Sequence, residues 1–385
     1  MTRVLSLAVM LGLVLSWTAA PAFAIKQFGD QFKDTYTKDN ANKDFIKLVD
    51  DAKCNVCHID GENKKKRNEY GEAVATLLKK ADFPADRFKK EPDKCKEEIE
   101  KALDTFGAPY VVKHDGLAAG KGVVVTNDRD EALTHALQSP RVVIEEFLDG
   151  PEVSLFGISD GTTVIPMQPA QDFKRAYDGD KGLNTGGMGA YSPLPWAPKN
   201  IEEEVLQKVL QPTINAMANR GTPFVGLLYA GLAMTSKGIR VIEFNARFGD
   251  PETEVLLPRL ETPLAQLLYS AATKSLDKFK ELKWSNKSAV TVVLASEGYP
   301  SEPKVDLPIT GINENENSFV YHAGTKLKDG VLHSAGGRVL TVTGIGENLS
   351  VARNNAYQVI SGITLAGSHY RSDIALTASQ LGSDK

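Results

Sequence analysis

The sequence predicts an α/β (α+β) fold from Gly107 onward, preceded by a small all-α region. Strand patterns alternate with helical patterns and glycine-rich loops from Gly107 to the C-terminus. A pattern typical of a buried strand over 238–242 runs into polar residues, and a glycine-rich loop joins strand patterns at 110–113 and 123–125. In the preceding region, apolar residues recur at helical spacing, as at Ile99, Leu103 and Phe106. We therefore expect a domain boundary near Phe106.

Length and composition exclude some classes of protein. The chain has 385 residues, of which 42% are hydrophobic, so it can bury a large core in two or three domains. This composition is not that of a disordered chain. The formal net charge of -4 is small for this length, and it gives no case for a nucleic-acid partner.

The first 24 residues have the pattern of a signal peptide. Arg3 precedes an apolar run over 4–17, and Ala22-Phe23-Ala24 is the small-x-small pattern that signal peptidase recognises. We expect cleavage after Ala24, with an uncleaved membrane anchor as the alternative. No other segment of the sequence is apolar and long enough to span a bilayer, so we expect no stable span after cleavage.

Residues 25–106 contain a motif for covalent haem. Cys54 and Cys57 are spaced to add to the two vinyl groups of a haem, and the adjacent His58 would bind the iron. A disulfide between the two cysteines, or a chance pair beside a surface histidine, is the alternative. The region has no methionine and no second histidine, which leaves a lysine, Tyr70 or an open site as the sixth ligand, and Cys95 has no evident role. It resembles small exported mono-haem c-type cytochromes, and thus predicts an electron-transfer module.

The end of the 238–242 strand carries a candidate metal site. Glu243 and Asn245 are two residues apart, so both side chains point to one face of the strand. Mg²⁺ and Mn²⁺ prefer oxygen ligands and leave positions open for water and phosphates. Arg247 follows on the same face and could hold a carboxylate or a phosphate.

The loop between the strands at 110–113 and 123–125 is a candidate phosphate site. Glycines let backbone N–H groups approach a phosphate closely, and Lys113 and Lys121 stand at the two ends of the loop. A simple turn is the alternative. It is not a Walker A loop, because glycine rather than Ser or Thr follows Lys121.

Further blocks extend this pattern towards nucleotide chemistry. A strand over 141–145 runs into a turn that could meet an adenine edge, and Glu152 lies just beyond it. Asp172 and Lys174 follow, then a glycine-rich loop over 184–190, and a strand over 226–232 that we expect to pair with the metal strand.

In this order, these blocks resemble the phosphoribosylamine–glycine ligase family of the ATP-grasp superfamily, over 107–376. The resemblance implies a ligase that uses ATP and Mg²⁺ or Mn²⁺ to convert glycine to glycyl phosphate, which 5-phosphoribosylamine then attacks. It implies ATP contacts from a lid and hinge, metal ligation, substrate contacts and catalytic groups at these residues: Lys113, Lys121, Glu145, Glu146, Phe147, Leu148 and Glu152 for ATP; Glu243 and Asn245 for the metal; Asn184, Thr185, Gly186, Gly187, Met188 and Gly189 for substrate; Asp172, Lys174 and Arg247 for catalysis.

The resemblance also sets the expected domains. It implies an ATP-grasp domain over 107–285 and a small α/β C-terminal domain over 286–378, with strands at 289–294 and 338–343 and a helix over 350–360. The family begins with a Rossmann-like domain that helps bind phosphoribosylamine, and none precedes Gly107. The lid's opening helix and first strand are also missing. We therefore expect a truncated ligase with weak or absent turnover.

The two halves conflict over location. A signal peptide and haem c imply the periplasm, whereas a purine-biosynthetic ligase needs cytosolic substrates. We favour a chimeric or rearranged reading frame over an exported fusion, and sequencing of continuous DNA across the codons for residues 95–120 would test this. The oligomeric state is not indicated by the sequence.

Overall fold

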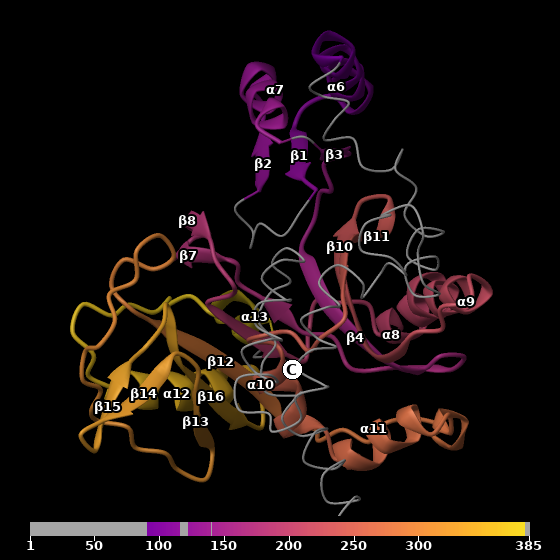
Figure 1. Ribbon diagram of the computed structural model, residues 1–385. Helices are drawn as coiled ribbons and strands as arrows, with labels where there is room; N and C mark the ends of the chain where they lie inside the picture. Colours follow the sequence, from indigo (N-terminus) through magenta and orange to yellow (C-terminus); the bar gives the residue numbers. More distant parts are fainter. Residues whose placement is uncertain (1–90, 116–121, 140, 382–385) are drawn as a thin grey trace, which may run out of the picture. The chain divides into compact units, whose positions relative to one another are not determined.

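The computed structural model describes residues 91–115, 122–139 and 141–381, and Figure 1 labels most of the elements. The first group of elements is a three-stranded antiparallel sheet with two helices. The strands lie in the order β2-β1-β3, and all elements of the group are α6 (Pro92–Phe106), β1 (Tyr110–His114), β2 (Val123–Thr126), α7 (Arg129–Leu137) and β3 (Val142–Glu145). The expected strands at 110–113 and 123–125 are confirmed.

Helix α6 packs with this sheet, which corrects the expected boundary at Phe106. Its buried residues Ile99 and Leu103 form one apolar core with Val112, Ala132 and Ala136. Helical spacing had assigned Ile99 and Leu103 to a separate N-terminal unit, but periodicity does not show which surface a helix covers. The compact unit that holds the sheet begins at residue 93.

The second group is a four-stranded antiparallel sheet in the order β11-β10-β4-β5. Its strands are β4 (Glu152–Asp160), β5 (Val164–Pro166), β10 (Val225–Thr235) and β11 (Gly238–Asn245). Alternate residues of β4 enter two different cores: Leu155 packs in one and Phe156 in the other. The sheet is thus covered on both faces, which explains the continuous burial along β4 and β10.

Helical segments supply the covers of this sheet. One cover consists of α8 (Ile201–Val205), the π-helical η2 (Leu206–Leu210) and α9 (Gln211–Asn219), and Leu210 and Ile214 share a core with Leu155. The other includes α10 (Thr253–Leu256), the short 3₁₀ turns η3 (Leu257–Arg259) and η4 (Leu276–Lys278), and α11 (Leu264–Ala272).

Strand β11 differs from expectation in its burial. It pairs antiparallel with β10, as predicted, but the expected buried strand is the edge strand of the sheet and is exposed at five of its eight positions. An edge strand has one neighbour, so apolar residues such as Val241 stay partly exposed.

The third group is a five-stranded sheet in the order β13-β16-β12-β9-β6. Its strands are β6 (Gln171–Asp172), β9 (Gly189–Ser192), β12 (Ser288–Ala295), β13 (Ser318–His322) and β16 (Arg338–Gly346). Helix α12 (Leu349–Ile360) packs on it, begins with an Asn348 cap on Val351 N at 3.0 Å, and confirms the expected helix. The strands expected at 289–294 and 338–343 are also confirmed.

This sheet crosses the division expected at residue 286. β9 pairs with β12 and β6 pairs with β9, so two strands from the expected ATP-grasp range complete the C-terminal sheet. The remaining elements are the hairpin of β7 (Arg175–Tyr177) and β8 (Lys181–Asn184), the hairpin of β14 (Thr325–Lys328) and β15 (Val331–Ser334), and α13 (Leu376–Gln380). The two ranges are therefore joined through one sheet.

Candidate active site

The two expected metal ligands lie together at the end of β11. Glu243 pairs with Gly231 of β10 and Asn245 pairs with Tyr229. Asn245 Nδ2 donates to Glu243 Oε1 at 3.1 Å, so both side chains share one face of the strand. A Cβ on Gly231 would lie 3.2 Å from Glu243 Cγ, so the glycine leaves space for this carboxylate.

This pair fits a hard divalent cation. A carboxylate and an amide each offer oxygen, and the amide can present its oxygen after rotation. No group of three or more His, Cys, Asp or Glu that could hold a metal occurs in the described part of the chain. A cation at Glu243 and Asn245 would thus depend on nucleotide phosphates and water for its remaining ligands.

The turn after β11 is fixed by a buried carboxylate that the sequence interpretation left without a role. Glu252 is 3% exposed, and its Oε1 accepts a hydrogen bond from Ser154 Oγ at 2.8 Å. Ser154 Oγ also lies 3.0 Å from Tyr229 Oη, so β4, β10 and the turn meet in one buried polar network. Gly249 is required here, because a Cβ would lie 2.5 Å from Glu252 Oε2.

Arg247, by contrast, is exposed. Its Nη1 donates to the Phe248 carbonyl at 2.9 Å, within its own turn. The structure places Arg247 two residues after Asn245 with its guanidinium open to solvent. Its role in holding an anion stays a prediction.

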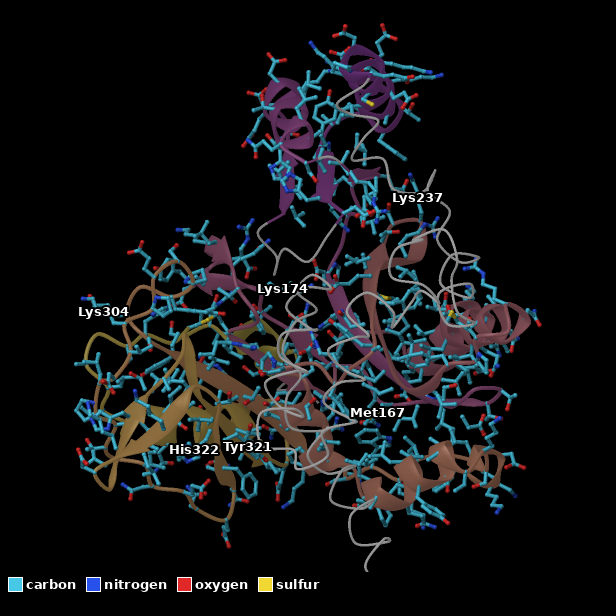
Figure 2. The ribbon with its side chains drawn as sticks, in the orientation of Figure 1. Met167, Lys174, Lys237, Lys304, Tyr321 and His322 are labelled. Atoms are coloured by element: carbon cyan, nitrogen blue, oxygen red, sulfur yellow. The ribbon has the colours of Figure 1, made fainter. Side chains whose placement is uncertain are left out.

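A cluster of charges surrounds Lys174, which is labelled in Figure 2. Lys174 Nζ forms an ion pair with Glu152 at the start of β4. Burial lowers the pKa of Lys174, but the carboxylates of Asp172 and Glu152 raise it by more, so the pKa lies above its ordinary value. Lys174 is therefore a cation at neutral pH. Its ion pair also gives Glu152 a partner other than the ribose expected from the resemblance.

Asp172 is the second catalytic candidate in this cluster. Burial raises the pKa of its carboxyl group to about 7, against the attraction of Lys174 and with further repulsion from Glu252 and Glu152. Asp172, Lys174, Glu152 and Glu252 thus form one electrostatically linked group, which joins β6, β4 and the turn after β11.

The glycine-rich loop packs directly on this cluster. Thr185 N donates to the Lys174 carbonyl at 2.7 Å, and Met188 N donates to the Phe173 carbonyl at 2.8 Å. Met188 is fully buried, whereas Asn184 is exposed. The loop therefore has a buried anchor at one end and an open, polar end.

Two residues from the C-terminal sheet region hold the glycines of this loop. Arg338 Nη1 donates to the Gly186 carbonyl at 2.9 Å and to Asp250 Oδ1 at 2.9 Å, which links the loop to the turn after β11. Tyr299 Oη accepts from Gly186 N at 3.0 Å. Gly187 has a φ of +113°, and a Cβ there would lie 2.5 Å from Pro251 Cδ.

The expected ATP-binding residues lie on the first sheet and the segment that follows it. Lys113 of β1 forms an ion pair with Glu145 at the end of β3. Glu146 lies within 4.0 Å of Lys237 and 3.9 Å of Arg240, at the β10–β11 hairpin. No strand includes Phe147 or Leu148, and Phe147 is 46% exposed. The structure leaves an open, partly apolar segment where an adenine was expected.

Several predicted residues lie outside the described part of the chain. They are Lys121 at the phosphate loop and Cys54, Cys57 and His58 of the haem motif, together with the signal peptide. Among the described residues, no helix is long and apolar enough to cross a bilayer.

Sequence interpretation missed Ser154, Tyr229, Arg338 and Tyr299. They lie between 75 and 152 residues from the groups they contact by chain position, and no local motif marks Ser154, Tyr229 or Tyr299. Arg338 does stand in a Gly336-Gly337-Arg338 run, and a Cβ on Gly337 would lie 2.2 Å from the Tyr299 ring. Paired glycines beside an arginine were the one available signal.

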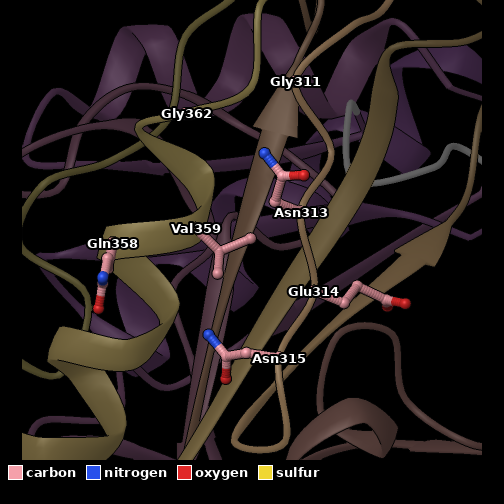
Figure 3. Close-up of a pocket in the computed structure, with 7 residues that line it drawn as sticks. All are labelled: Gly311, Asn313, Glu314, Asn315, Gln358, Val359 and Gly362. Atoms are coloured by element: carbon pink, nitrogen blue, oxygen red, sulfur yellow. The ribbon is translucent and has the colours of Figure 1, made fainter.

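A separate pocket opens in the C-terminal part of the molecule. It has a volume of about 270 Å³ and lies between a loop and the end of α12, as Figure 3 shows. The lining residues are Gly311, Asn313, Glu314, Asn315, Gln358, Val359 and Gly362. None of the predicted site residues is among them.

Two family models match this chain. The model described as "Phosphoribosylglycinamide synthetase, ATP-grasp (A) domain" matches residues 73–253, and the model for the C domain of the same enzyme matches residues 289–377. The first match begins inside the segment that we assigned to a haem-bearing unit, and it does not reach the haem motif. The comparisons give no support to the signal peptide, the haem or a chimeric reading frame.

Individual relatives agree with the family models. A phosphoribosylamine–glycine ligase from Streptomyces coelicolor is 60% identical over 286 residues, which are 73% of this chain and 69% of the relative. One from Leifsonia xyli is 56% identical over 285 residues, or 72% and 68% of the two chains. The crystal structure of a phosphoribosylamine–glycine ligase from Thermotoga maritima is similar with a TM-score of 0.67 and 33% identity, covering 73% of this chain and 72% of that one.

Proposed function

The chain belongs to the phosphoribosylglycinamide synthetase family of ATP-grasp ligases, and from this premise we propose how its residues perform the family's reaction. These enzymes are carboxylate–amine ligases: they join glycine to 5-phosphoribosylamine, and they convert ATP to ADP and phosphate. The ATP-grasp fold and C domain are those that the sequence resemblance implied.

One observation carries the assignment of the site. The glycine-rich loop bonds to the Lys174 carbonyl through Thr185 and, through Arg338, to Asp250 in the turn that follows the expected metal pair. Glu252 in the same turn bonds to Ser154 of β4, the strand whose Glu152 pairs with Lys174. A cation site beside a half-buried ammonium and a loop with open polar groups is suited to transfer of a phosphoryl group to a carboxylate.

The charge of each site residue indicates its role in the reaction. Glu243 and Asn245 would hold Mg²⁺ or Mn²⁺, which supplies charge neutralisation to the phosphates of ATP when bound. Lys174 remains protonated and attracts the glycine carboxylate or the transferring phosphoryl group. Arg247, exposed beside the metal pair, adds a second cation for the same anions. No side-chain nucleophile is needed, because the glycine carboxylate itself attacks the γ-phosphorus.

The proposed ATP-binding residues belong to the first sheet, to the loop between β1 and β2, and to the segment that follows β3. Lys113 and Lys121 would face the phosphates, and Glu145, Glu146, Phe147 and Leu148 would meet the adenine. Support comes from the exposed apolar side chain of Phe147 and from Lys113, which already lies against a carboxylate and can exchange it for a phosphate. Glu152 would reach the ribose only after exchanging its bond to Lys174.

The loop of Asn184, Thr185, Gly186, Gly187, Met188 and Gly189 would border the acyl phosphate and exclude water. Glycyl phosphate hydrolyses readily, so a wall close to it preserves the intermediate for the amine. Asp172, with a pKa of about 7, can accept the proton that the amine nitrogen of 5-phosphoribosylamine loses as it attacks the acyl phosphate and displaces phosphate.

The test measures the two half-steps separately in the full chain. With ATP, Mg²⁺, glycine and hydroxylamine, the first step should yield glycine hydroxamate and phosphate; with 5-phosphoribosylamine, the yield of ribonucleotide tests separately the weak turnover that the sequence predicts. Glu243→Ala should abolish both. Glu347→Ala, which alters an exposed strand-end glutamate directly after β16, should leave both unchanged. Phosphate release that does not require glycine, or that survives Glu243→Ala, would contradict the assignment.

A further inference from the structure

A fully buried arginine outside the proposed catalytic set holds the hairpin that connects two parts of the site. Arg371, close to the C-terminus, is 1% exposed and is among the largest fully buried side chains of the described residues. The β7–β8 hairpin begins directly after Lys174 and ends at Asn184. The hairpin is therefore the segment of chain that connects Lys174 to the glycine-rich loop.

The β7–β8 hairpin has few buried residues and few strand pairs of its own. β8 is exposed at all four positions, and only Ala176 is buried in β7. Its ladder has two registered pairs and an irregularity between them. A short two-stranded hairpin is marginal in water, so its position must come from contacts elsewhere.

Those contacts come from residues 371–373. Arg371 Nη1 donates to Asp180 Oδ1 at 2.8 Å and to the Arg175 carbonyl at 3.2 Å, at the tip and the start of the hairpin. Gly179 N donates to Asp373 Oδ2 at 2.8 Å, and Ser372 N donates to Asp178 Oδ1 at 2.8 Å. The turn is thus bound on three successive residues.

The same guanidinium also reaches the site end of the hairpin. Arg371 Cζ lies 4.9 Å from the centroid of the Phe173 ring, and Phe173 stands between Asp172 and Lys174. Asp373 holds the guanidinium in a bidentate pair, with Nε to Oδ1 and Nη2 to Oδ2 both at 2.7 Å. One planar group therefore fixes the hairpin tip and the residue between the two catalytic candidates.

We propose that Arg371, oriented by Asp373, is a positioning residue for this ligase site: it locks the β7–β8 hairpin and thereby sets Lys174 and the glycine-rich loop relative to each other. This inference rests on the proposed function for its kinetic consequence. Its structural part, the locking of the hairpin, stands independently. A lysine cannot replace the arginine fully, because a point charge does not reproduce the fork that binds Asp373 and Asp180 together.

The experiment compares Arg371→Met and Arg371→Lys with a matched buried arginine. Arg259 is 3% exposed and donates to Ser192 Oγ and the Lys287 carbonyl, both at 2.6 Å, away from the hairpin. Arg371→Met should lower kcat for glycine-dependent ATP cleavage by roughly 10- to 100-fold, since small misplacement of reacting groups has effects of this size. The KM for ATP should change less than about twofold, because the predicted ATP groups lie on other elements. Arg371→Lys should recover part of kcat.

Hydrogen exchange supplies the readout that does not need turnover. The amides of Thr185 and Met188, which bond to the carbonyls of Lys174 and Phe173, should exchange faster in Arg371→Met and keep their rates in Arg259→Met. Asp180→Asn, which leaves the buried Arg371–Asp373 pair intact, serves if Arg371→Met does not fold, and it should accelerate the same amides to a smaller extent.

The outcomes separate the two claims. Equal losses of kcat in Arg371→Met and Arg259→Met at equal loss of stability would overturn the positioning role. Unchanged exchange in Arg371→Met, or in Asp180→Asn if Arg371→Met does not fold, would overturn the locking of the hairpin. Absence of ATP cleavage in the wild type, with exchange altered as expected, would refute the proposed function and leave the locked hairpin standing.

Discussion

Replacement of Gly187 by alanine tests whether the glycine-rich loop really lies against the turn after β11. Gly187 has a φ of +113°, where L-residues are strained, and its added Cβ would lie 2.5 Å from Pro251 Cδ and 3.4 Å from the Asp250 carbonyl oxygen. Pro251 is buried and its ring cannot rotate away. The loop or the turn must therefore move.

The expected loss of stability has two parts. The positive φ costs alanine about 1–2 kcal/mol, and overpacking in a closed site costs about 1–3 kcal/mol more. Gly221→Ala separates the two, because Gly221 also has a positive φ, +76°, but an added Cβ would meet nothing within 4 Å. Gly221→Ala should lose only the first part, and Gly187→Ala should lose about 2–5 kcal/mol in total.

Urea unfolding measures this difference. The fluorescence of Trp196 and Trp284 reports on the unit that contains the site, and midpoints are compared at constant slope. Gly187→Ala should also slow hydroxamate formation, whereas Gly221→Ala should not. Equal midpoints for the two variants would refute the close approach of the loop to Pro251.

Three further substitutions test other parts of the structure. Leu103→Ala empties a fully buried position in the core of the first sheet and should cost about 2–5 kcal/mol, seen as faster hydrogen exchange at Val112; unchanged exchange would separate α6 from this sheet. Ser154→Ala removes the donor to the buried Glu252 and should cost about 1–3 kcal/mol, measured as a lower urea midpoint, and a neutral result would remove the network from the site. Burial raises the pKa of Glu254 from its ordinary 4.5 to about 7, so this group favours folding below pH 4.5 and loses that contribution as the pH rises through 7. Glu254→Gln should therefore gain stability relative to the wild type between about pH 4 and pH 8, by at most about 3 kcal/mol at 1.4 kcal/mol per pH unit; parallel pH profiles of the two proteins would contradict this.

Much of the fold followed from local pattern. The strand pairs at 110–113 with 123–125 and at 226–232 with the metal strand were predicted, because a glycine loop or a short hairpin leaves few alternatives for neighbouring strands. The alternation of Glu243 and Asn245 onto one face follows from the two-residue period of any strand, and the structure confirms their contact.

Other expectations failed for an identifiable physical reason. The metal strand is an edge strand although Ile239, Val241 and Ile242 indicated a buried one, because burial depends on which strands are neighbours. Helix α6 packs on the first sheet although its spacing fits any amphipathic helix. The C-domain match over residues 289–377 agrees with the boundary expected at residue 286, but β6 and β9 from before it pair into the C-terminal sheet, because pairing between distant strands leaves no mark in local sequence.

The sequence by itself determined the family, and it placed the candidate metal ligands at the end of one strand and the glycine-rich loop, because these depend on residue type and short spacing. Only the tertiary structure decided how these groups are held. Arg338 and Arg371 lie more than 150 residues from the loop and the hairpin that they bind, by chain position, and Ser154 reaches Glu252 across 98 residues. Such contacts form when the whole core folds, so the residues that position the site can be read only from the folded chain.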